Sequence, residues 1–113
     1  WRFKTNGSVP GSTAVTEDTV YVGSYDKYVY ALDRNTGQEK WRFKTEKGVF
    51  SSPTVVDDYL YIGSMDENLY VLKTDTGQLV WKFKTSGDIL SSPLVQNGMV
   101  FFGSDDRSLY AVK

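Results

Sequence analysis

Carboxylates are the main side chains in this sequence that could act as acids, bases or metal ligands. The chain contains no His and no Cys, which removes the commonest general base and every thiolate. Asp26, Asp66 and Asp106 stand 40 residues apart, each in a Gly-Ser-x-Asp segment. Aspartates in short loops can bind Ca²⁺ or transfer protons, but they also cap backbone amides in turns.

The repetition of these aspartates favours the turn-capping interpretation. A catalytic site seldom recurs in every repeat, whereas a hairpin turn recurs with its repeat. The adjacent pairs Asp57-Asp58 and Asp105-Asp106 lack the flanking acidic residues that a calcium loop needs to supply its roughly six to eight oxygen ligands. We therefore predict a protein that is not an enzyme, with no catalytic residue, no metal site and no cofactor.

The composition excludes two further classes of function. Thirteen Lys and Arg residues against fourteen Asp and Glu residues leave a formal net charge of -1 among 113 residues. Nucleic acid is therefore excluded as the main partner, because phosphate binding needs a basic surface. No apolar run approaches the roughly 20 residues of a membrane-spanning helix, so we predict no membrane span.

A repeat of 40 residues organises the chain and must position the aspartates. The segment Trp1-Arg2-Phe3-Lys4-Thr5 returns, with a single Arg-to-Lys change, at residues 41–45 and 81–85 without gaps. A single domain, 1–113, is therefore predicted. Its repeats are 1–40, 41–80 and 81–113. A period of about 40–45 residues is typical of β-propeller blades.

Four short strands are expected in each repeat. In the second repeat they cover residues 54–56, 59–62, 69–72 and 78–85, separated by turns rich in Asp, Asn and Gly. The second and third strands are apolar on both faces, which is typical of strands between neighbouring sheets. The fourth alternates apolar and basic residues, so one of its faces should be exposed. The predicted fold is an all-β propeller of four-stranded antiparallel blades, with three blades' worth of strands.

The segment from Ala31 to Trp41, ALDRNTGQEKW, resembles the tryptophan-docking motif of quinoprotein-type (PQQ-like) propeller repeats. In that family the Trp packs between small residues of the motif and locks adjacent blades. The second copy keeps Thr-Gly and Trp but has Val71 for Ala and Lys73 for Asp, and the third stops at Lys113. The resemblance implies blade-docking roles for Trp1, Trp41, Trp81, Gly37 and Gly77.

The resemblance leaves several functions open. The family includes quinone-dependent dehydrogenases, which bind pyrroloquinoline quinone and Ca²⁺. It also includes the propeller lipoprotein of the outer-membrane barrel-assembly machinery and sensor domains of receptor kinases, which bind no quinone. Our leading hypothesis is a non-enzymatic scaffold for protein–protein interaction or assembly, at a periplasmic or cell-surface location implied by the resemblance. The alternatives are a fragment of a dehydrogenase, a ligand- or carbohydrate-sensing domain, or an engineered repeat without a natural ligand.

Four side chains are candidates for a binding surface. Tyr25 and Tyr28 lie in a turn where the other repeats have no aromatic residue. Phe50 and Leu90 precede Ser-Ser-Pro segments that lead toward the axial opening, where the first repeat has Pro10. Phe50 and Leu90 either line a binding surface there or plug the space between blades.

The ends of the chain predict an incomplete ring. Three full repeats would need 120 residues, and 113 is seven short, so the chain begins with a fourth strand and ends after a third. The strand at residues 1–5 can complete the last blade. Because closed propellers have about 4–8 blades, we expect either a homodimer that closes six blades by strand exchange or a part of a larger propeller completed by the rest of its parent protein.

Overall fold

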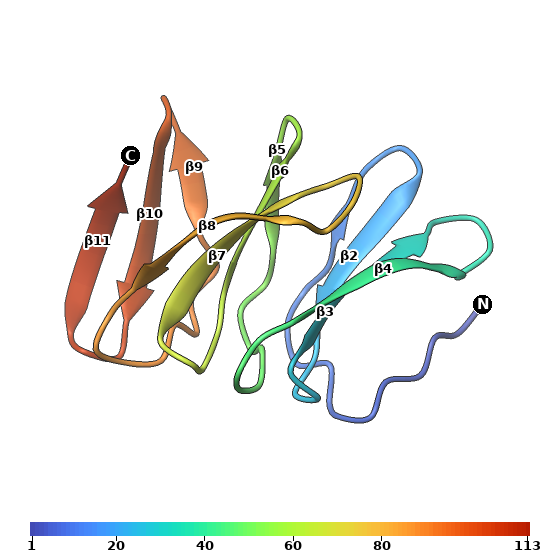
Figure 1. The fold of residues 1–113 in the computed structure, drawn as a ribbon, viewed down its shortest axis with the longest axis horizontal. Helices are drawn as coiled ribbons and strands as arrows, with labels where there is room; N and C mark the ends of the chain where they lie inside the picture. The colour runs from blue at the N-terminus through green and yellow to red at the C-terminus, as the bar shows by residue number, and fades with distance from the viewer.

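The computed structural model describes residues 1–113 and consists of three antiparallel sheets standing side by side as blades (Figure 1). The sheets have the orders β1-β2-β3-β4, β5-β6-β7-β8 and β11-β10-β9. The strands are β1 (Ala14–Val15), β2 (Thr19–Gly23), β3 (Tyr28–Asp33), β4 (Glu39–Lys44), β5 (Thr54–Val56), β6 (Tyr59–Gly63), β7 (Asn68–Lys73), β8 (Leu79–Lys84), β9 (Leu94–Gln96), β10 (Met99–Ser104) and β11 (Ser108–Val112). The predicted all-β fold of antiparallel blades is confirmed. No helix that could cross a lipid bilayer is present.

The hydrophobic core lies between the blades. Its largest cluster joins side chains of the first two blades, and a second cluster joins the second blade to the third. Val49 and Ile89 are fully buried at these two interfaces, where each faces a glycine at the end of a middle strand. A Cβ atom at Gly23 would lie 2.3 Å from Val49, and one at Gly63 would lie 2.2 Å from Ile89. Glycine is therefore required at both places so that the blades can approach closely.

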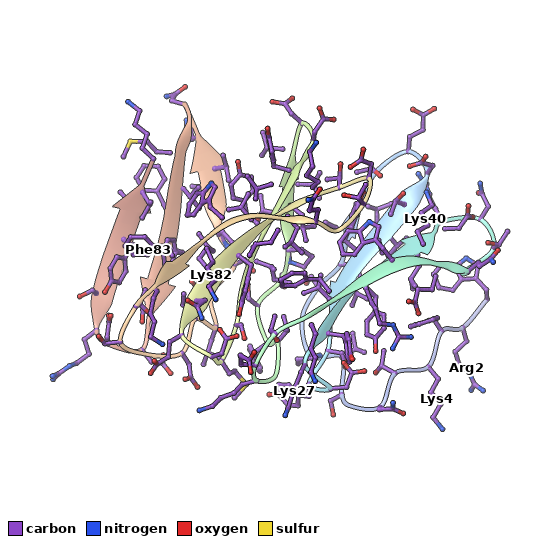
Figure 2. All side chains as sticks on the ribbon, viewed as in Figure 1. Arg2, Lys4, Lys27, Lys40, Lys82 and Phe83 are labelled. Carbon is purple, nitrogen blue, oxygen red and sulfur yellow. The ribbon has the colours of Figure 1, made fainter.

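The outer strands alternate as the sequence predicts. On β4, Trp41 is buried while Arg42 is exposed. On β8, Phe83 is half-buried and Lys82 is exposed; both are labelled in Figure 2. Basic side chains on an exposed outer strand discourage pairing with other sheets.

Residues 1–5 differ from the sequence prediction, because they form no strand in the structure. This segment lies against the first blade, where the Phe3 ring meets the Tyr30 ring edge-on with centroids 5.2 Å apart. A strand requires a hydrogen-bonded neighbour, and β11, the strand that lacks an outer partner, lies at the opposite end of the molecule (Figure 1). Within one chain the last blade therefore has three strands and an open fourth position.

Candidate functional site

Each repeated aspartate lies at a junction between two successive units of the chain, and Asp66 is the most buried of the three. Its Oδ1 accepts a hydrogen bond from the backbone N–H of Asn68 at 3.0 Å. Its Oδ2 accepts one from the Tyr70 hydroxyl at 2.5 Å and another from the backbone N–H of Glu46, beyond the end of β4, at 3.0 Å. The carboxylate thus joins its own turn and strand to the preceding blade, in agreement with the turn-capping interpretation.

The same junction recurs at the other two aspartates. Asp26 accepts a hydrogen bond from the Tyr30 hydroxyl at 2.5 Å, and Asp106 accepts one from the Tyr110 hydroxyl at 2.5 Å. Asp26 also binds the amide of Asn6, and Asp106 binds the amide of Ser86. The tyrosine partner was not predicted, although the sequence carries a signal for it, since a Tyr follows each Asp by four residues.

At Asp66 and Asp106 these contacts shift the pKa of the carboxylate and of its tyrosine partner in opposite directions. Burial acts to raise the pKa of Asp66, but hydrogen bonds from Tyr70 and from the amides of Glu46 and Asn68 outweigh it, so the pKa is lowered. The pKa of Asp106 is lowered mainly by the hydrogen bond from Tyr110. Burial, together with the bond to Asp66, raises the pKa of the Tyr70 hydroxyl. The junction therefore favours a charged carboxylate and a neutral tyrosine.

This pairing predicts that the stability of the chain falls at both ends of the pH scale. Because the folded pKa of Asp66 lies below its ordinary value of 3.8, the unfolded chain takes up a proton first as the pH falls. The carboxylate contribution is then lost below about pH 4. Because the folded pKa of Tyr70 lies above 10.0, the unfolded chain loses its proton first, so stability also falls above about pH 10.

The measurement is the free energy of unfolding in urea between about pH 2 and pH 11. Asp66→Asn is the control variant, since it cannot ionise, and its acid slope should be shallower than that of the wild type. A wild-type stability that is unchanged below pH 4, or an acid slope unaffected by the substitution, would contradict the assignment.

Two of the three tryptophans lie flat on a glycine of the next blade. A Cβ atom built on Gly37 would lie 2.5 Å from the Trp1 ring, and one on Gly77 would lie 2.4 Å from the Trp41 ring. Both glycines have positive φ, at 77° and 76°, which other residues adopt only with strain. The indole N–H of Trp41 also donates to the carbonyl of Thr74 at 2.9 Å.

The third tryptophan has no such glycine. The position 40 residues after Gly77 lies beyond Lys113, and Trp81 is half-buried beside the cluster shared by the second and third blades. Trp1 differs in another way, because it is docked on Gly37 but 61% exposed. Trp41 alone among the three is both docked on a glycine and buried.

The structure brings together two of the four candidate surface residues and separates a third. The rings of Tyr25 and Phe50 lie 6.1 Å apart, and the two side chains are 41% and 38% exposed. Leu90, equivalent to Phe50 in the next repeat, is partly buried. The Tyr28 ring instead lies tilted beside the Tyr30 ring, with centroids 5.8 Å apart. Tyr28 therefore packs against the cluster of Val22, Tyr30 and Leu32 and has no ring contact with Tyr25 or Phe50.

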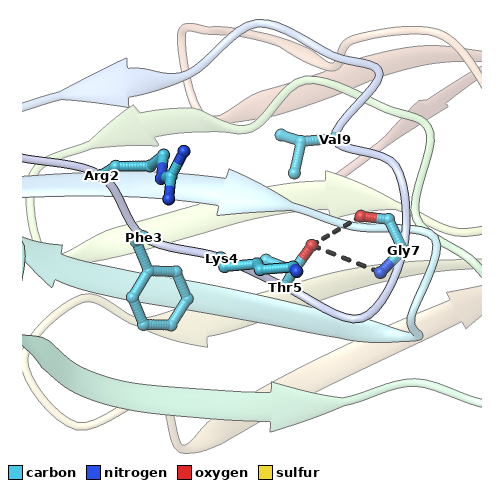
Figure 3. A pocket seen from close by; sticks show the side chains of 6 residues that line it. All are labelled: Arg2, Phe3, Lys4, Thr5, Gly7 and Val9. Carbon is cyan, nitrogen blue, oxygen red and sulfur yellow. Dashed lines mark hydrogen bonds between the residues drawn. The ribbon is translucent and has the colours of Figure 1, made fainter.

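Two of the three surface hollows lie at the N-terminal segment, and the third lies between the first two blades beside Asp18 and Thr74. The first, of about 400 Å³, is shown in Figure 3. It is lined by Arg2, Phe3, Lys4, Thr5, Gly7 and Val9. A second, apolar hollow of about 260 Å³ adjoins it and is lined in part by Val20, Val22 and Leu32. These two hollows mark the face of the first blade that no neighbouring sheet covers, since residues equivalent to Phe3 and Val9 pack between blades elsewhere in the chain.

The three meander sheets, their 40-residue period and the match to a family model define the class of the protein: a β-propeller of PQQ-like repeats. The chain belongs to the family described as outer membrane protein assembly factor BamB, which matches residues 1–61 and 26–113. Among curated proteins, no match to this sequence was found.

Similar solved structures support this family assignment. The crystal structure of BamB from Moraxella catarrhalis is 25% identical over 98% of this chain, with a TM-score of 0.87. Two computationally designed proteins, Ika4 and Ika8, share the fold at 18% identity over 88% of this chain, with TM-scores of 0.78 and 0.76. This chain spans 35% of the BamB structure, 62% of Ika4 and 31% of Ika8.

Proposed function

We propose that this chain is a non-enzymatic propeller scaffold that binds a protein partner through the surface formed by Tyr25 and Phe50. The proposal rests on this exposed pair of aromatic side chains. Its two rings come from different blades, Tyr25 from the β2–β3 turn and Phe50 from the segment before β5, and they meet at the surface 6.1 Å apart. Aromatic side chains that are well supported from below are typical centres of protein interfaces.

The surroundings of this pair support a protein ligand. Tyr25 and Met65 both contact Gly48, because a Cβ atom there would lie 3.2 Å from the Tyr25 ring and 3.4 Å from the Met65 sulfur. Met65 is partly exposed, so the aromatic pair continues into a flexible apolar side chain. Methionine adapts to irregular surfaces and is frequent at binding faces.

The residues present do not fit a quinone–calcium site. Such a site needs several oxygen ligands that converge on one cation. No group of three or more His, Cys, Asp or Glu side chains is close enough to hold a metal ion. The carboxylate of Asp66 already accepts a tyrosine hydroxyl and two backbone amides. We therefore favour binding over dehydrogenase chemistry.

The description of the family supports a cellular location and a type of partner for the proposed scaffold. BamB is described as an outer membrane protein assembly factor, which favours an envelope location and an assembly partner for this chain. Since the chain spans 35% of the BamB structure, its partner is defined here only by chemistry, as a protein segment with apolar side chains that pack on Tyr25, Phe50 and Met65.

The test uses a displayed library of random peptides as the probe, selected against the 113-residue chain. Peptides with apolar anchors should be enriched, and the double variant Tyr25→Ser, Phe50→Ser should bind them at least about tenfold more weakly, because the two rings supply most of the contact. Tyr59→Ser removes another exposed aromatic ring and should bind as the wild type does. Equal binding by all three proteins would contradict the proposal.

A further inference from the structure

The Tyr25–Phe50 surface continues onto the next blade. Met65 and Leu90 stand 40 residues after Tyr25 and Phe50, at the same two repeat positions. The β2–β3 and β6–β7 turns, which carry Tyr25 and Met65, lie along one edge of the molecule, at the bottom of Figure 1. Met65 and Leu90 are partly exposed. The four side chains therefore form an apolar row (Tyr25, Phe50, Met65 and Leu90) along this edge.

Backbone hydrogen bonds hold the row together. The segment that enters a blade, just before its first strand, is bonded both to the turn of the preceding blade and to the turn of its own blade. These bonds run from the amides of Val49 and Ile89 to the carbonyls of Ser24 and Ser64, at 2.9 and 3.0 Å, and from the amides of Met65 and Asp105 to the carbonyls of Gly48 and Asp88, at 3.0 and 2.9 Å. The apolar row is therefore one preformed surface, which loses little conformational freedom when a partner binds.

On the third blade the row changes from apolar to acidic. Asp105 stands at the repeat position of Met65, and Asp88 stands at that of Gly48. Neither carboxylate is neutralised by Arg107 or by another cation, since the three ion pairs of the chain are Lys40–Asp18, Arg42–Glu39 and Lys84–Glu67. A surface that passes from apolar to anionic side chains is complementary to a partner that passes from apolar to basic ones.

The spacing of the blades sets the spacing of the partner's residues. Packed sheets lie about 10 Å apart, and an extended chain advances about 3.3 Å per residue. One step from blade to blade therefore corresponds to about three residues of an extended segment.

We infer that the partner is an extended protein segment with two apolar residues about three positions apart and a Lys or Arg about three positions beyond the second. The first apolar residue packs on Tyr25 and Phe50, and the second packs on Met65 and Leu90. The cation lies at the carboxylates of Asp88 and Asp105. This inference rests on the proposed function and specifies the ligand of the same surface.

The first test asks which residues are enriched when short random peptides on a displayed library are selected against the 113-residue chain. Lys or Arg should be enriched about three positions from the second of two apolar residues. Enrichment of apolar residues without a basic one would overturn this inference and leave the proposed function standing. Enrichment of no apolar residue would overturn both.

The second test removes the charge at the acidic end of the row. One enriched peptide is synthesised in two versions, with its Lys or Arg and with Gln in that place. The double variant Asp88→Asn, Asp105→Asn should bind the basic peptide about threefold to tenfold more weakly than the wild type does, because each exposed ion pair contributes little. It should bind the Gln peptide as the wild type does.

The matched control for this variant is Asp57→Asn, Asp58→Asn. It also removes two exposed carboxylates, but from the β5–β6 turn at the opposite edge of the molecule, the top of Figure 1. It should bind the basic peptide as the wild type does. Equal losses in the two double variants would show that net charge alone attracts the peptide, and would overturn the inference.

The third test measures how far the row extends. Leu90→Ser should weaken binding of the basic peptide by at least about threefold, whereas Leu79→Ser, which removes an exposed leucine from the start of β8, should not. Urea unfolding checks that both variants are folded. Unchanged binding by Leu90→Ser would confine the surface to Tyr25, Phe50 and Met65 and overturn the inference.

Discussion

Replacing Asp66 with Ala is expected to lower the free energy of unfolding by about 3–5 kcal/mol. Asp66 is 7% exposed, and its carboxylate holds four donors, namely the Tyr70 hydroxyl, the backbone amides of Asn68 and Glu46, and the side-chain amide of Asn68. Alanine would leave these donors without an acceptor in a place that water reaches poorly, and each unsatisfied donor costs about 1–3 kcal/mol. The measurement is urea unfolding at pH 7, with the thermal midpoint as a second readout.

The other aspartates provide the matched controls for this prediction. Asp106 makes three of these four kinds of bond but lies at the open end, where it is partly exposed. Water can replace the lost acceptor there, so Asp106→Ala should lower the free energy of unfolding by clearly less than Asp66→Ala does. Tyr70→Phe removes only the hydroxyl and should cost less than Asp66→Ala. Equal losses at Asp66 and Asp106 would show that burial does not govern the energy of the junction.

Replacing Trp41 with Ala is expected to cost about 3–5 kcal/mol. Its indole is buried between Gly77 of the second blade and Tyr21 of the first, whose ring centroid lies 6.0 Å away. Removing it opens a cavity at the blade interface and leaves the carbonyl of Thr74 without the indole N–H. A loss of this size is a large fraction of the roughly 5–15 kcal/mol that stabilises a typical domain.

The two end tryptophans are the controls for this substitution. Trp1→Ala should cost about 1 kcal/mol, because the ring is 61% exposed although it lies on Gly37. Trp81→Ala should fall between the two, since Trp81 is half-buried but has no docking glycine. Urea unfolding at pH 7 should rank the three variants by their loss of unfolding free energy. A cost at Trp81 equal to that at Trp41 would mean that the glycine contact adds nothing to the burial of the ring.

Both predictions concern one strand, which is held at each end by the next blade. Trp41 near the start of β4 lies on Gly77, and the amide of Glu46 just past its end binds Asp66. The second blade thus fixes the outer strand of the first blade at two separate points. Strand β4 also pairs with β3 of its own blade. Loss of either contact should therefore weaken the packing between the two blades more than the hydrogen bonding within each blade.

The repeat, the positions of most strands and the class of fold can all be predicted from the amino-acid sequence. The 40-residue period placed the hairpins correctly because turn residues and alternating apolar residues act locally, within a few positions of one another. Alternation along the outer strands also predicted which side is exposed, as Trp41 and Arg42 show. Repetition of Asp26, Asp66 and Asp106 was enough to favour a structural role over a catalytic one.

Which side chains meet across the blades depends on how the blades pack and cannot be predicted from the sequence. The bond from the Glu46 amide to Asp66 and the contact of Tyr25 with Phe50 join residues 20 and 25 positions apart, and no local pattern encodes such pairs. Val49 and Ile89, one position before the predicted Phe50 and Leu90, turned out to be the buried plugs at the blade interfaces. Side-chain direction in an irregular segment has no fixed period, so only the packed blades could show which residue points inward.

The N-terminal segment shows most directly that local sequence does not decide which residues pair. Trp1 to Thr5 repeats the sequence of β4 and β8 yet forms no strand, because a strand exists only beside a partner with which it can share hydrogen bonds. Sequence specifies the side chains that such a strand presents. The presence of a neighbouring edge decides whether the strand forms, and within a single chain that edge lies at the far end of the fold.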